Sequence, residues 1–293
     1  MNKEIVIVYA GLATEKITKF GNKTFMEFQN GPNIFKKYYE QNDIPTINLN
    51  EIFKEEGGVL TKDNTQKYTD FYKKLFKQNK IPITIGGDHG ITVSATLAAN
   101  EIYDSDTVRF DRHIDAISYM ENNLLPYHHK NPDEENFTII LNTLPESSFV
   151  HIGGPFDENS ETSYMFEPEL EDHIASSIRK IKRSRDVEFL TEKNMNEHNA
   201  LLNKFADKSN KDIYISIDVD ILKEVKPKGC KHVPNSGLID SKKIKEYVES
   251  LSRKKNIVGL DICEISDAPN HEISGKCGGE IMRNTLPLLN ISN

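Results

Sequence analysis

Short hydrophobic runs rich in isoleucine and valine recur along the chain. They occupy residues 4–11, 81–87, 107–111, 147–154, 212–220 and 256–264. Such runs, with little polar interruption, are typical of parallel strands covered on both faces. Segments of helical composition lie between them, at residues 64–79, 92–103, 171–184, 192–208 and 240–254. The alternation predicts an α/β fold with a mostly parallel central sheet and helices on both faces.

The same alternation continues without a linker rich in proline, glycine or serine, which predicts a single domain over residues 1–293. One segment differs from the rest. Residues 119–137 are polar and rich in asparagine, which predicts a long loop. Loops at the carboxyl edge of a parallel sheet are where ligands are usually held.

Composition narrows the class of partner. A net charge of −8 argues against nucleic acid and is compatible with a small cationic substrate. The apolar run at the N-terminus is too short for a membrane span and lacks the layout of a signal peptide, so we expect no membrane partner. Cys230, Cys263 and Cys277 show no paired spacing, which favours reduced thiols in a cytoplasmic protein.

Acidic and histidine side chains gather where four of the predicted strands end. These residues are Asp88, His89, Asp111, His113, Asp115, Asp218, Asp220, Asp261 and Glu264. Residues two apart share a face of an extended chain, so Asp111, His113 and Asp115 lie together if the strand conformation continues. The carboxyl ends of neighbouring parallel strands face one crevice, where many carboxylates repel one another unless cations neutralise them.

The donor types indicate the ion. Two imidazoles and four carboxylates, without a thiolate, suit Mn²⁺ or a similar divalent metal better than a structural zinc ion. Six donors are more than one catalytic ion needs from the protein, so two bridged ions fit better. The predicted metal ligands are His89, Asp111, His113, Asp115, Asp218 and Asp220.

Each motif alone also has a simpler interpretation. The "DRHID" segment is compatible with a charged edge that faces water, and "DVD" with a solvated strand end. "GGDH" is compatible with a tight turn in which Asp88 or His89 caps the following helix. The metal-site hypothesis depends on all three ending strands of one domain.

Taken together, these motifs resemble the ureohydrolase family of arginases and agmatinases. The matching segments are "PITIGGDHGIT", "DRHID", "SIDVDIL", "GLDICEISDAP", "FQNGPNIFKKY" and "VHIGGPFD", in the family's order from about residue 28 to 290. The resemblance implies the three-layer α/β arginase fold, a centre of two Mn²⁺ ions and hydrolysis of a guanidino group to urea and an amine. It also implies a homo-oligomer, usually a trimer or hexamer.

The resemblance assigns roles to individual residues. One metal would be held by His89, Asp111, Asp115 and Asp218, and the other by Asp111, His113, Asp218 and Asp220. Glu264 would pair with the guanidinium, unless it is a surface or helix-capping residue. A loop histidine would protonate the leaving amine; spacing favours His128 over His129, and a solvent-exposed pair is the alternative.

Several positions depart from the family pattern and bear on the substrate. Arg112 replaces a small residue, Gly90 replaces a serine, the "DP" after the third motif is missing, and the loop reads "PYHHKNPD". Ile117 stands where arginases have an asparagine that contacts the α-carboxylate, which disfavours free arginine. In the acidic stretch 156–172, Asp157 or Glu161 is a candidate for holding a distal amine, with a solvated loop as the alternative.

These departures favour an agmatinase that converts agmatine to putrescine and urea, a step of polyamine biosynthesis. The alternatives are an arginase and another guanidino or formimino hydrolase. Two rivals come from other classes. A histone-deacetylase-like amidase would use one zinc ion and fewer ligands. A non-catalytic relative would keep the metals and use its rebuilt loop to bind a regulator.

Overall fold

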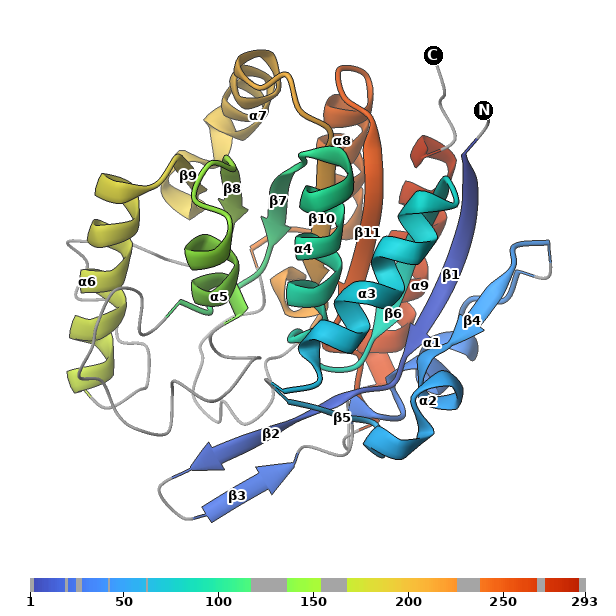
Figure 1. The fold of residues 1–293 in the computed structure, drawn as a ribbon. Helices are drawn as coiled ribbons and strands as arrows, with labels where there is room; N and C mark the ends of the chain where they lie inside the picture. The colour runs from blue at the N-terminus through green and yellow to red at the C-terminus, as the bar shows by residue number, and fades with distance from the viewer. Residues whose placement is uncertain are drawn as a thin grey trace.

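The computed structural model describes residues 3–18, 21–24, 28–41, 43–61, 63–116, 136–153, 168–225, 238–267 and 272–289. Within them, eight strands form a parallel central sheet in the order β4-β1-β6-β11-β10-β7-β8-β9 (Figure 1). The strands are β1 (Glu4–Ala10), β4 (Thr46–Asn48), β6 (Lys80–Gly86), β7 (Asp106–Phe110), β8 (Phe149–Ile152), β9 (Val187–Leu190), β10 (Ile213–Asp218) and β11 (Ile257–Cys263). A second sheet joins β2 (Ala13–Thr18), β3 (Gly21–Thr24) and β5 (Val59–Leu60).

Helices separate most of these strands along the described chain. The α-helices are α1 (Gly31–Lys36), α2 (Leu49–Ile52), α3 (Thr65–Lys77), α4 (Ile91–Tyr103), α5 (Asn136–Thr143), α6 (Pro168–Ser184), α7 (His198–Lys208), α8 (Ser241–Ser252) and α9 (Glu272–Leu289). Short 3₁₀ turns are η2 (Lys54–Glu56), η4 (Glu192–Glu197) and η5 (Val219–Ile221). None of the described helices has both the length and the hydrophobicity to cross a bilayer.

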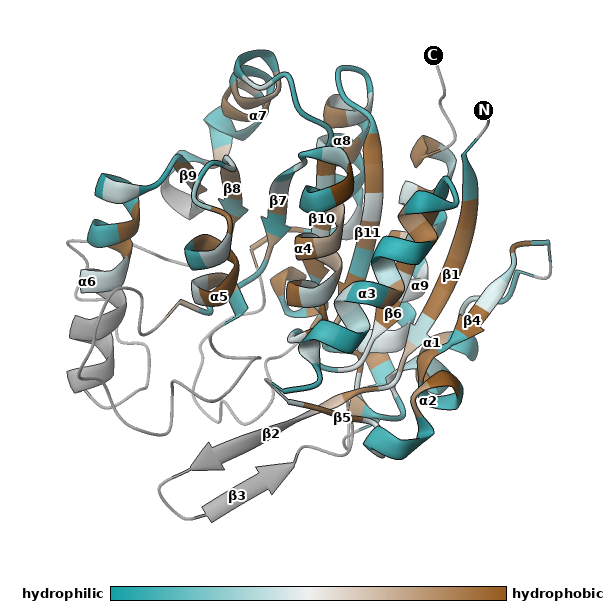
Figure 2. Cartoon of the chain, in the orientation of Figure 1, coloured by the Kyte–Doolittle hydropathy of each residue, from teal (hydrophilic) through white to brown (hydrophobic). Residues whose placement is uncertain are grey.

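Strand β1 shows why its sequence is apolar at successive positions. Ile5 and Ile7 belong to a core shared with α1, α7, α8 and α9, whereas Val6 and Val8 belong to a core shared with α3 and α4. In Figure 1, α3, α4 and α5 lie in front of the sheet, and α8 and α9 lie behind it. Figure 2 shows β1 and β11 as largely hydrophobic and the outward side of α3 as largely hydrophilic. The predicted three-layer α/β fold is confirmed.

Each predicted strand and helix overlaps one in the structure, but two of these predictions were wrong in kind or extent. Residues 192–208 form η4 followed by α7 instead of one helix, because Asn194 has non-helical angles (φ −110°, ψ 23°). Its side chain makes a capping box with Thr191 instead. The predicted strand 212–220 ends at Asp218, where the chain turns into η5.

Helix α9 was missed because it contains three glycines and Pro287, all poor helix formers. A Cβ at Gly275 would lie 2.6 Å from Ile34 Cγ2 and 3.0 Å from the Ile34 carbonyl oxygen. Glycine is therefore needed here because α9 packs directly on α1, and close packing outweighs helix propensity.

The four central strands bring the predicted site residues to one edge of the sheet. β6, β11, β10 and β7 are neighbours in this order, although β10 and β11 come last in sequence. Asp218 is in register with Cys263, and Ile217 with Phe110, so these strands end at nearly the same level. The residues that follow them therefore meet at the carboxyl edge of the sheet, as expected for this topology.

We predict that Gly153→Ala disturbs this edge. A Cβ at Gly153 would lie 1.6 Å from the Asp111 carbonyl oxygen, so the backbone must shift. The substitution should lower the free energy of unfolding by about 3 kcal/mol. Gly57→Ala is a matched control, because its Cβ meets nothing within 4 Å and only its φ of +61° opposes alanine. We expect about 1 kcal/mol for the control. Equal losses in urea titrations of the two variants would contradict the prediction.

A second prediction concerns acid sensitivity. His198 Nε2 donates to the Thr191 carbonyl, and Nδ1 accepts from the Tyr247 hydroxyl. Burial lowers the pKa of His198 below its ordinary value of 6.5, so below that pH the unfolded chain binds this proton more readily than the folded chain. The contribution of His198 to the free energy of unfolding should therefore fall as the pH drops from 7.5 to 5.5.

The His198→Gln variant should lose part of this pH dependence, measured by urea unfolding at the two pH values. An identical slope in wild type and variant would show that His198 does not contribute to it.

Candidate metal centre

The turn after β6 directs His89 into the protein. Asp88 Oδ1 accepts a hydrogen bond from the Gly90 backbone N–H at 2.9 Å, which holds a tight turn before α4. His89 is 1% exposed, and its ring lies beside Asp111, which follows β7, and Asp218, which ends β10. The turn interpretation of "GGDH" thus applies to Asp88, while His89 joins the acidic cluster.

The segment after β7 is buried, but it is not extended. Asp111 is 0% exposed, which excludes a charged edge facing water. Its Oδ1 accepts from the His113 backbone N–H at 2.6 Å, and Asp115 has a left-handed φ of 47°. The expectation that strand geometry alone aligns Asp111, His113 and Asp115 is therefore wrong. A side-chain-braced turn brings them together.

Three carboxylate oxygens surround one nitrogen of His89. Nδ1 lies 3.2 Å from Asp111 Oδ2, 3.3 Å from Asp115 Oδ2 and 3.4 Å from Asp218 Oδ2, and it makes no hydrogen bond to any described residue. Burial alone lowers the pKa of His89, but these acids outweigh burial and raise it well above 6.5. Nδ1 therefore needs a cation beside it, whether a proton or a metal ion.

A hydrogen bond to Ser216 fixes the other nitrogen of His89. Nε2 lies 3.0 Å from Ser216 Oγ, and Ser216 in turn donates to Asp261 Oδ1 at 2.8 Å. Because the serine proton points to Asp261, Ser216 accepts from Nε2–H. The Nδ1 lone pair, which faces the carboxylates, would then be available to a metal ion in place of a proton. A second hydrogen bond of this kind is typical of metal-bound histidine.

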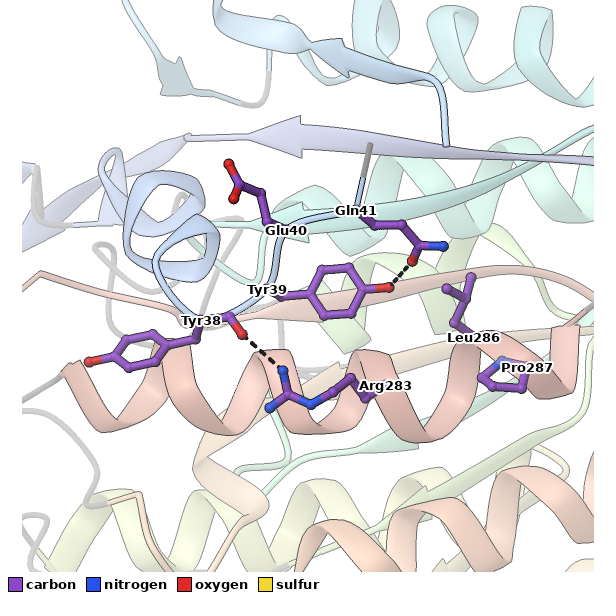
Figure 3. Close-up of a pocket in the computed structure, with 7 residues that line it drawn as sticks. All are labelled: Tyr38, Tyr39, Glu40, Gln41, Arg283, Leu286 and Pro287. Atoms are coloured by element: carbon purple, nitrogen blue, oxygen red, sulfur yellow. Dashed lines mark hydrogen bonds between the residues drawn. The ribbon is translucent and has the colours of Figure 1, made fainter. Parts of the chain in front are cut away.

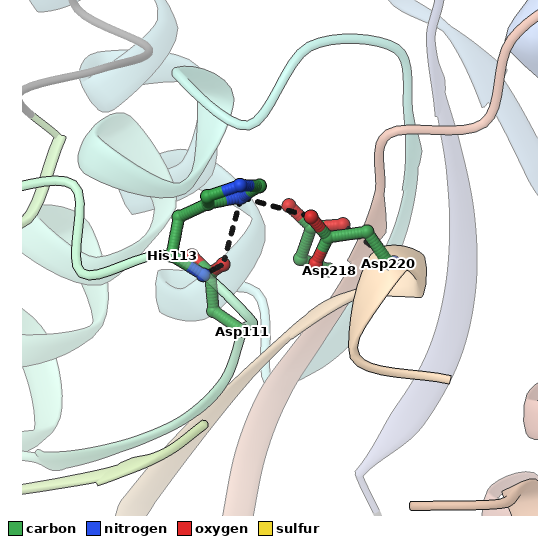
Figure 4. A group of neighbouring side chains, drawn as sticks. All are labelled: Asp111, His113, Asp218 and Asp220. Atoms are coloured by element: carbon green, nitrogen blue, oxygen red, sulfur yellow. Dashed lines mark hydrogen bonds and ion pairs between the residues drawn. The ribbon is translucent and has the colours of Figure 1, made fainter. Parts of the chain in front are cut away.

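A second group of donors lies beside the first. One donor atom each of Asp111, His113, Asp218 and Asp220 lies within 4.8 Å of the others (Figure 4). His113 Nδ1 is 2.8 Å from Asp220 Oδ2, and its side chain is 31% exposed, so this group is open to solvent on one side. Asp220 raises the pKa of His113 to about 10, against the opposing effect of burial.

Burial and neighbouring acids disfavour the charged forms of Asp111 and Asp218. Burial, and then the neighbouring Asp115, raise the pKa of Asp111 to about 7. Burial, Asp220 and Asp111 raise the pKa of Asp218 well above its ordinary value. A pair of divalent cations would remove this repulsion, and the oxygen and imidazole donors suit such ions. The described residues thus fit a two-metal centre.

Glu264 stands at the end of β11 with a left-handed φ of 63°. Its backbone N–H donates to the Gly87 carbonyl, and its Oε1 accepts from the His89 backbone N–H at 3.1 Å. The side chain thus braces the turn before α4, in keeping with the capping alternative. It also stands on the strand next to both β6 and β10, at the edge that carries the donors.

The structure adds two polar residues that the sequence reasoning missed. Arg109 is fully buried, and its Nη2 lies 2.6 Å from Asp111 Oδ2. Asn136 Nδ2 donates to Asp115 Oδ2 at 2.8 Å. An arginine inside the apolar run "TVRFD" was an available signal, because a buried charge requires a partner.

The six predicted ligands therefore converge, and their role as ligands stays a prediction. Asp261 lies beneath them, where Tyr214 and Ser216 donate to it. His128, His129, Asp157 and Glu161 lie outside the described residues. The two described cysteines, Cys263 and Cys277, are free and buried.

A separate cavity of about 410 Å³ lies between the end of α1 and α9 (Figure 3). It is lined by Tyr38, Tyr39, Glu40, Gln41, Arg283, Leu286 and Pro287. Arg283 Nη1 donates to the Tyr38 carbonyl at 2.9 Å. None of the donors lines this cavity, so it does not belong to the candidate metal centre.

Comparisons with known proteins agree with this arrangement. The arginase from Bacillus caldovelox is similar in structure, with a TM-score of 0.69 and 14% identity over 99% of both chains. The formimidoylglutamase from Bacillus subtilis gives a TM-score of 0.67 and 15% identity over 100% of this chain and 89% of its own. The agmatine ureohydrolase of Thermoplasma volcanium gives 0.62 and 17% over 98% and 90%. At these identities the likeness concerns the fold.

Sequence comparison supplies the family. An uncharacterized 32.2 kDa protein of Methanothermus fervidus is 26% identical over 229 residues, which cover 78% of this chain and 70% of that protein. The family model for the arginase family matches residues 18–286. The family's members are hydrolases that cleave C–N bonds of guanidino or amidine groups. With a matching fold and nearly the whole length matched, the chain belongs to the arginase family.

Proposed function

We propose that this ureohydrolase is agmatinase-like and uses two Mn²⁺ ions to convert agmatine to putrescine and urea. The observation that carries the metal centre is the pair of donor groups that share Asp111. One ion would be held by His89, Asp111, Asp115 and Asp218. The other would be held by Asp111, His113, Asp218 and Asp220. Asp111 and Asp218 would bridge them.

The chemistry requires this assembly because a guanidinium carbon is a poor electrophile. Two divalent ions, when bound, lower the pKa of a water molecule and so supply a nucleophile at neutral pH. The protein's own contribution is to fix the donors: Ser216 sets the His89 ring, and the Arg112 backbone N–H holds Asp220 Oδ1 at 3.2 Å. Ligands fixed in this way need no rearrangement during the reaction.

Substrate orientation falls to Glu264 in this proposal. A carboxylate is the planar partner of a guanidinium, and Glu264 directly follows β11, which lies between two strands that carry donors. We propose that His128 protonates the leaving amine and that Asp157 holds the distal amine of agmatine. Both roles rest on the sequence and the family resemblance.

The choice of agmatine rests on the chain's departures from the arginase pattern. Ile117, which lies outside the described residues, has an apolar side chain with no polar group to offer an α-carboxylate, and agmatine has no such carboxylate. The similar structures include an arginase, an agmatine ureohydrolase and a formimidoylglutamase, so fold likeness does not choose among these substrates. An arginase or formimino hydrolase is the alternative.

We also propose that the chain acts as one catalytic domain, because the donors come from strands in both halves of the sequence. By family resemblance, we propose a homotrimer or homohexamer. The charge of −8 supports a small cationic partner over a nucleic acid.

The substrate proposal predicts urea release from agmatine in the presence of Mn²⁺, with kcat/KM at least tenfold higher than for arginine, equivalent to about 1.4 kcal/mol. The assay compares agmatine, arginine and formiminoglutamate, the last by release of formamide or ammonia. A preference for arginine would overturn the agmatinase assignment. Protein that holds two metals but turns over none of the three would support the non-catalytic alternative.

The metal assignment predicts that His113→Ala binds one Mn²⁺ per chain where wild type binds two, and loses at least about 100-fold in kcat. Metal content is measured by elemental analysis after gel filtration. Asp207→Ala serves as the control, because Asp207 is an exposed partner of Lys254 and should leave both ions in place. Two ions in His113→Ala would refute the assignment of this residue.

A further inference from the structure

Arg109 is a buried cation within the candidate metal centre. It lies in β7 with 0% exposure and is the largest fully buried side chain of the described chain. Its Nη2 lies 2.6 Å from Asp111 Oδ2 and 3.0 Å from Asp115 Oδ2. Because arginine stays protonated in proteins, this charge is permanent.

The oxygens that Arg109 contacts are the ones that face His89. Asp111 Oδ2 and Asp115 Oδ2 lie 3.2 and 3.3 Å from His89 Nδ1. Asp115 Oδ2 also accepts from Asn136 Nδ2 at 2.8 Å. Two donors thus already occupy an oxygen that would ligate the His89 ion. The Asp220 side of the centre differs, since His113 faces Asp220 there and no contact from Arg109 to Asp218 or Asp220 is seen in the described residues.

The surroundings hold the guanidinium in place. Nη1 donates to the Ile114 carbonyl at 3.1 Å, and Cζ lies 4.7 Å above the Phe137 ring. His151, the register partner of Arg109 on β8, stacks on the same ring at 5.8 Å. The site is closed on these sides by buried groups, so the cation has no solvent to withdraw into.

We propose that Arg109 is a fixed third cation of the centre, which competes with the metal at the His89 position. It offsets Asp111 and Asp115 when that metal is absent and repels the metal when it binds. The two positions are therefore unequal: the His113 position binds tightly, and the His89 position binds weakly. This inference rests on the proposed two-metal centre but not on the proposed substrate.

The test is a calorimetric titration of metal-free protein with Mn²⁺, without substrate. Wild type should bind two ions with dissociation constants that differ at least about tenfold, because a cation and a dication a few ångströms apart repel by that much even in water. In Arg109→Met, the weaker ion should bind at least about tenfold more tightly, while the tighter ion changes little. Arg253→Met is the matched control, because Arg253 is an exposed partner of Glu249 and should change neither constant.

Thermal unfolding with and without a chelator supplies a second readout. Arg109→Met should lose more thermal stability on metal removal than wild type, because only the variant leaves Asp111 and Asp115 without a fixed cation. If Arg109→Met does not fold, Arg109→Gln keeps two donors without the charge and should show the same changes. The titration of the wild-type protein tests whether the two positions are unequal, even if no variant folds.

The possible results distinguish the competition by Arg109, the two-metal centre and the substrate. Two equal sites in wild type, or a weaker ion that binds less tightly in a folded Arg109 variant, would overturn the competition, and the second result would make Arg109 a positioning residue. A chain that binds no Mn²⁺ would overturn the two-metal centre and this inference together. Inactivity on agmatine with the predicted titration would overturn only the substrate.

Discussion

Mutual repulsion among four carboxylates at one sheet edge is the constraint on which the site depends. Asp111, Asp115, Asp218 and Asp220 lie together with little access to water, where charges repel strongly. The neighbouring groups offset this repulsion. His89 and His113 stand between the acids, Arg109 supplies a permanent charge, and backbone N–H groups of residues 112, 113 and 220 donate to the carboxylates. The fold and a divalent metal site thus both depend on positive charge and N–H donors placed around the same four carboxylates.

The parts of the fold that followed from the sequence are those in which local pattern and topology agree. Apolar runs such as that of β1 are buried on both faces and therefore read clearly as parallel strands. Helix α9 did not follow, because its glycines are there for contact with α1, a relation between distant segments. Asn194 likewise prefers a capping hydrogen bond to the helix that composition favoured.

The candidate site shows the same division. Parallel topology alone placed the acids and histidines after four strands at one edge. The actual geometry around Asp115 comes from a turn with a left-handed residue, which alternation along a strand does not describe. The role of Arg109 was not predicted, because the same turn places its partners Asp111 and Asp115. His128 is proposed from its spacing and Asp157 from an acidic stretch, and both lie outside the described residues.

The order of strands has a consequence for how the protein is made. β6 and β7 are synthesised first, and β11 and β10 later insert between them. His89, Asp111 and Asp115 leave the ribosome roughly a hundred residues, or about 5–20 s, before Asp218. Until then, β6 and β7 each present an open edge, and the acids near them have no complete set of partners. The full set of four carboxylates can therefore come together only late in synthesis, when β10 and β11 fill the gap between β6 and β7.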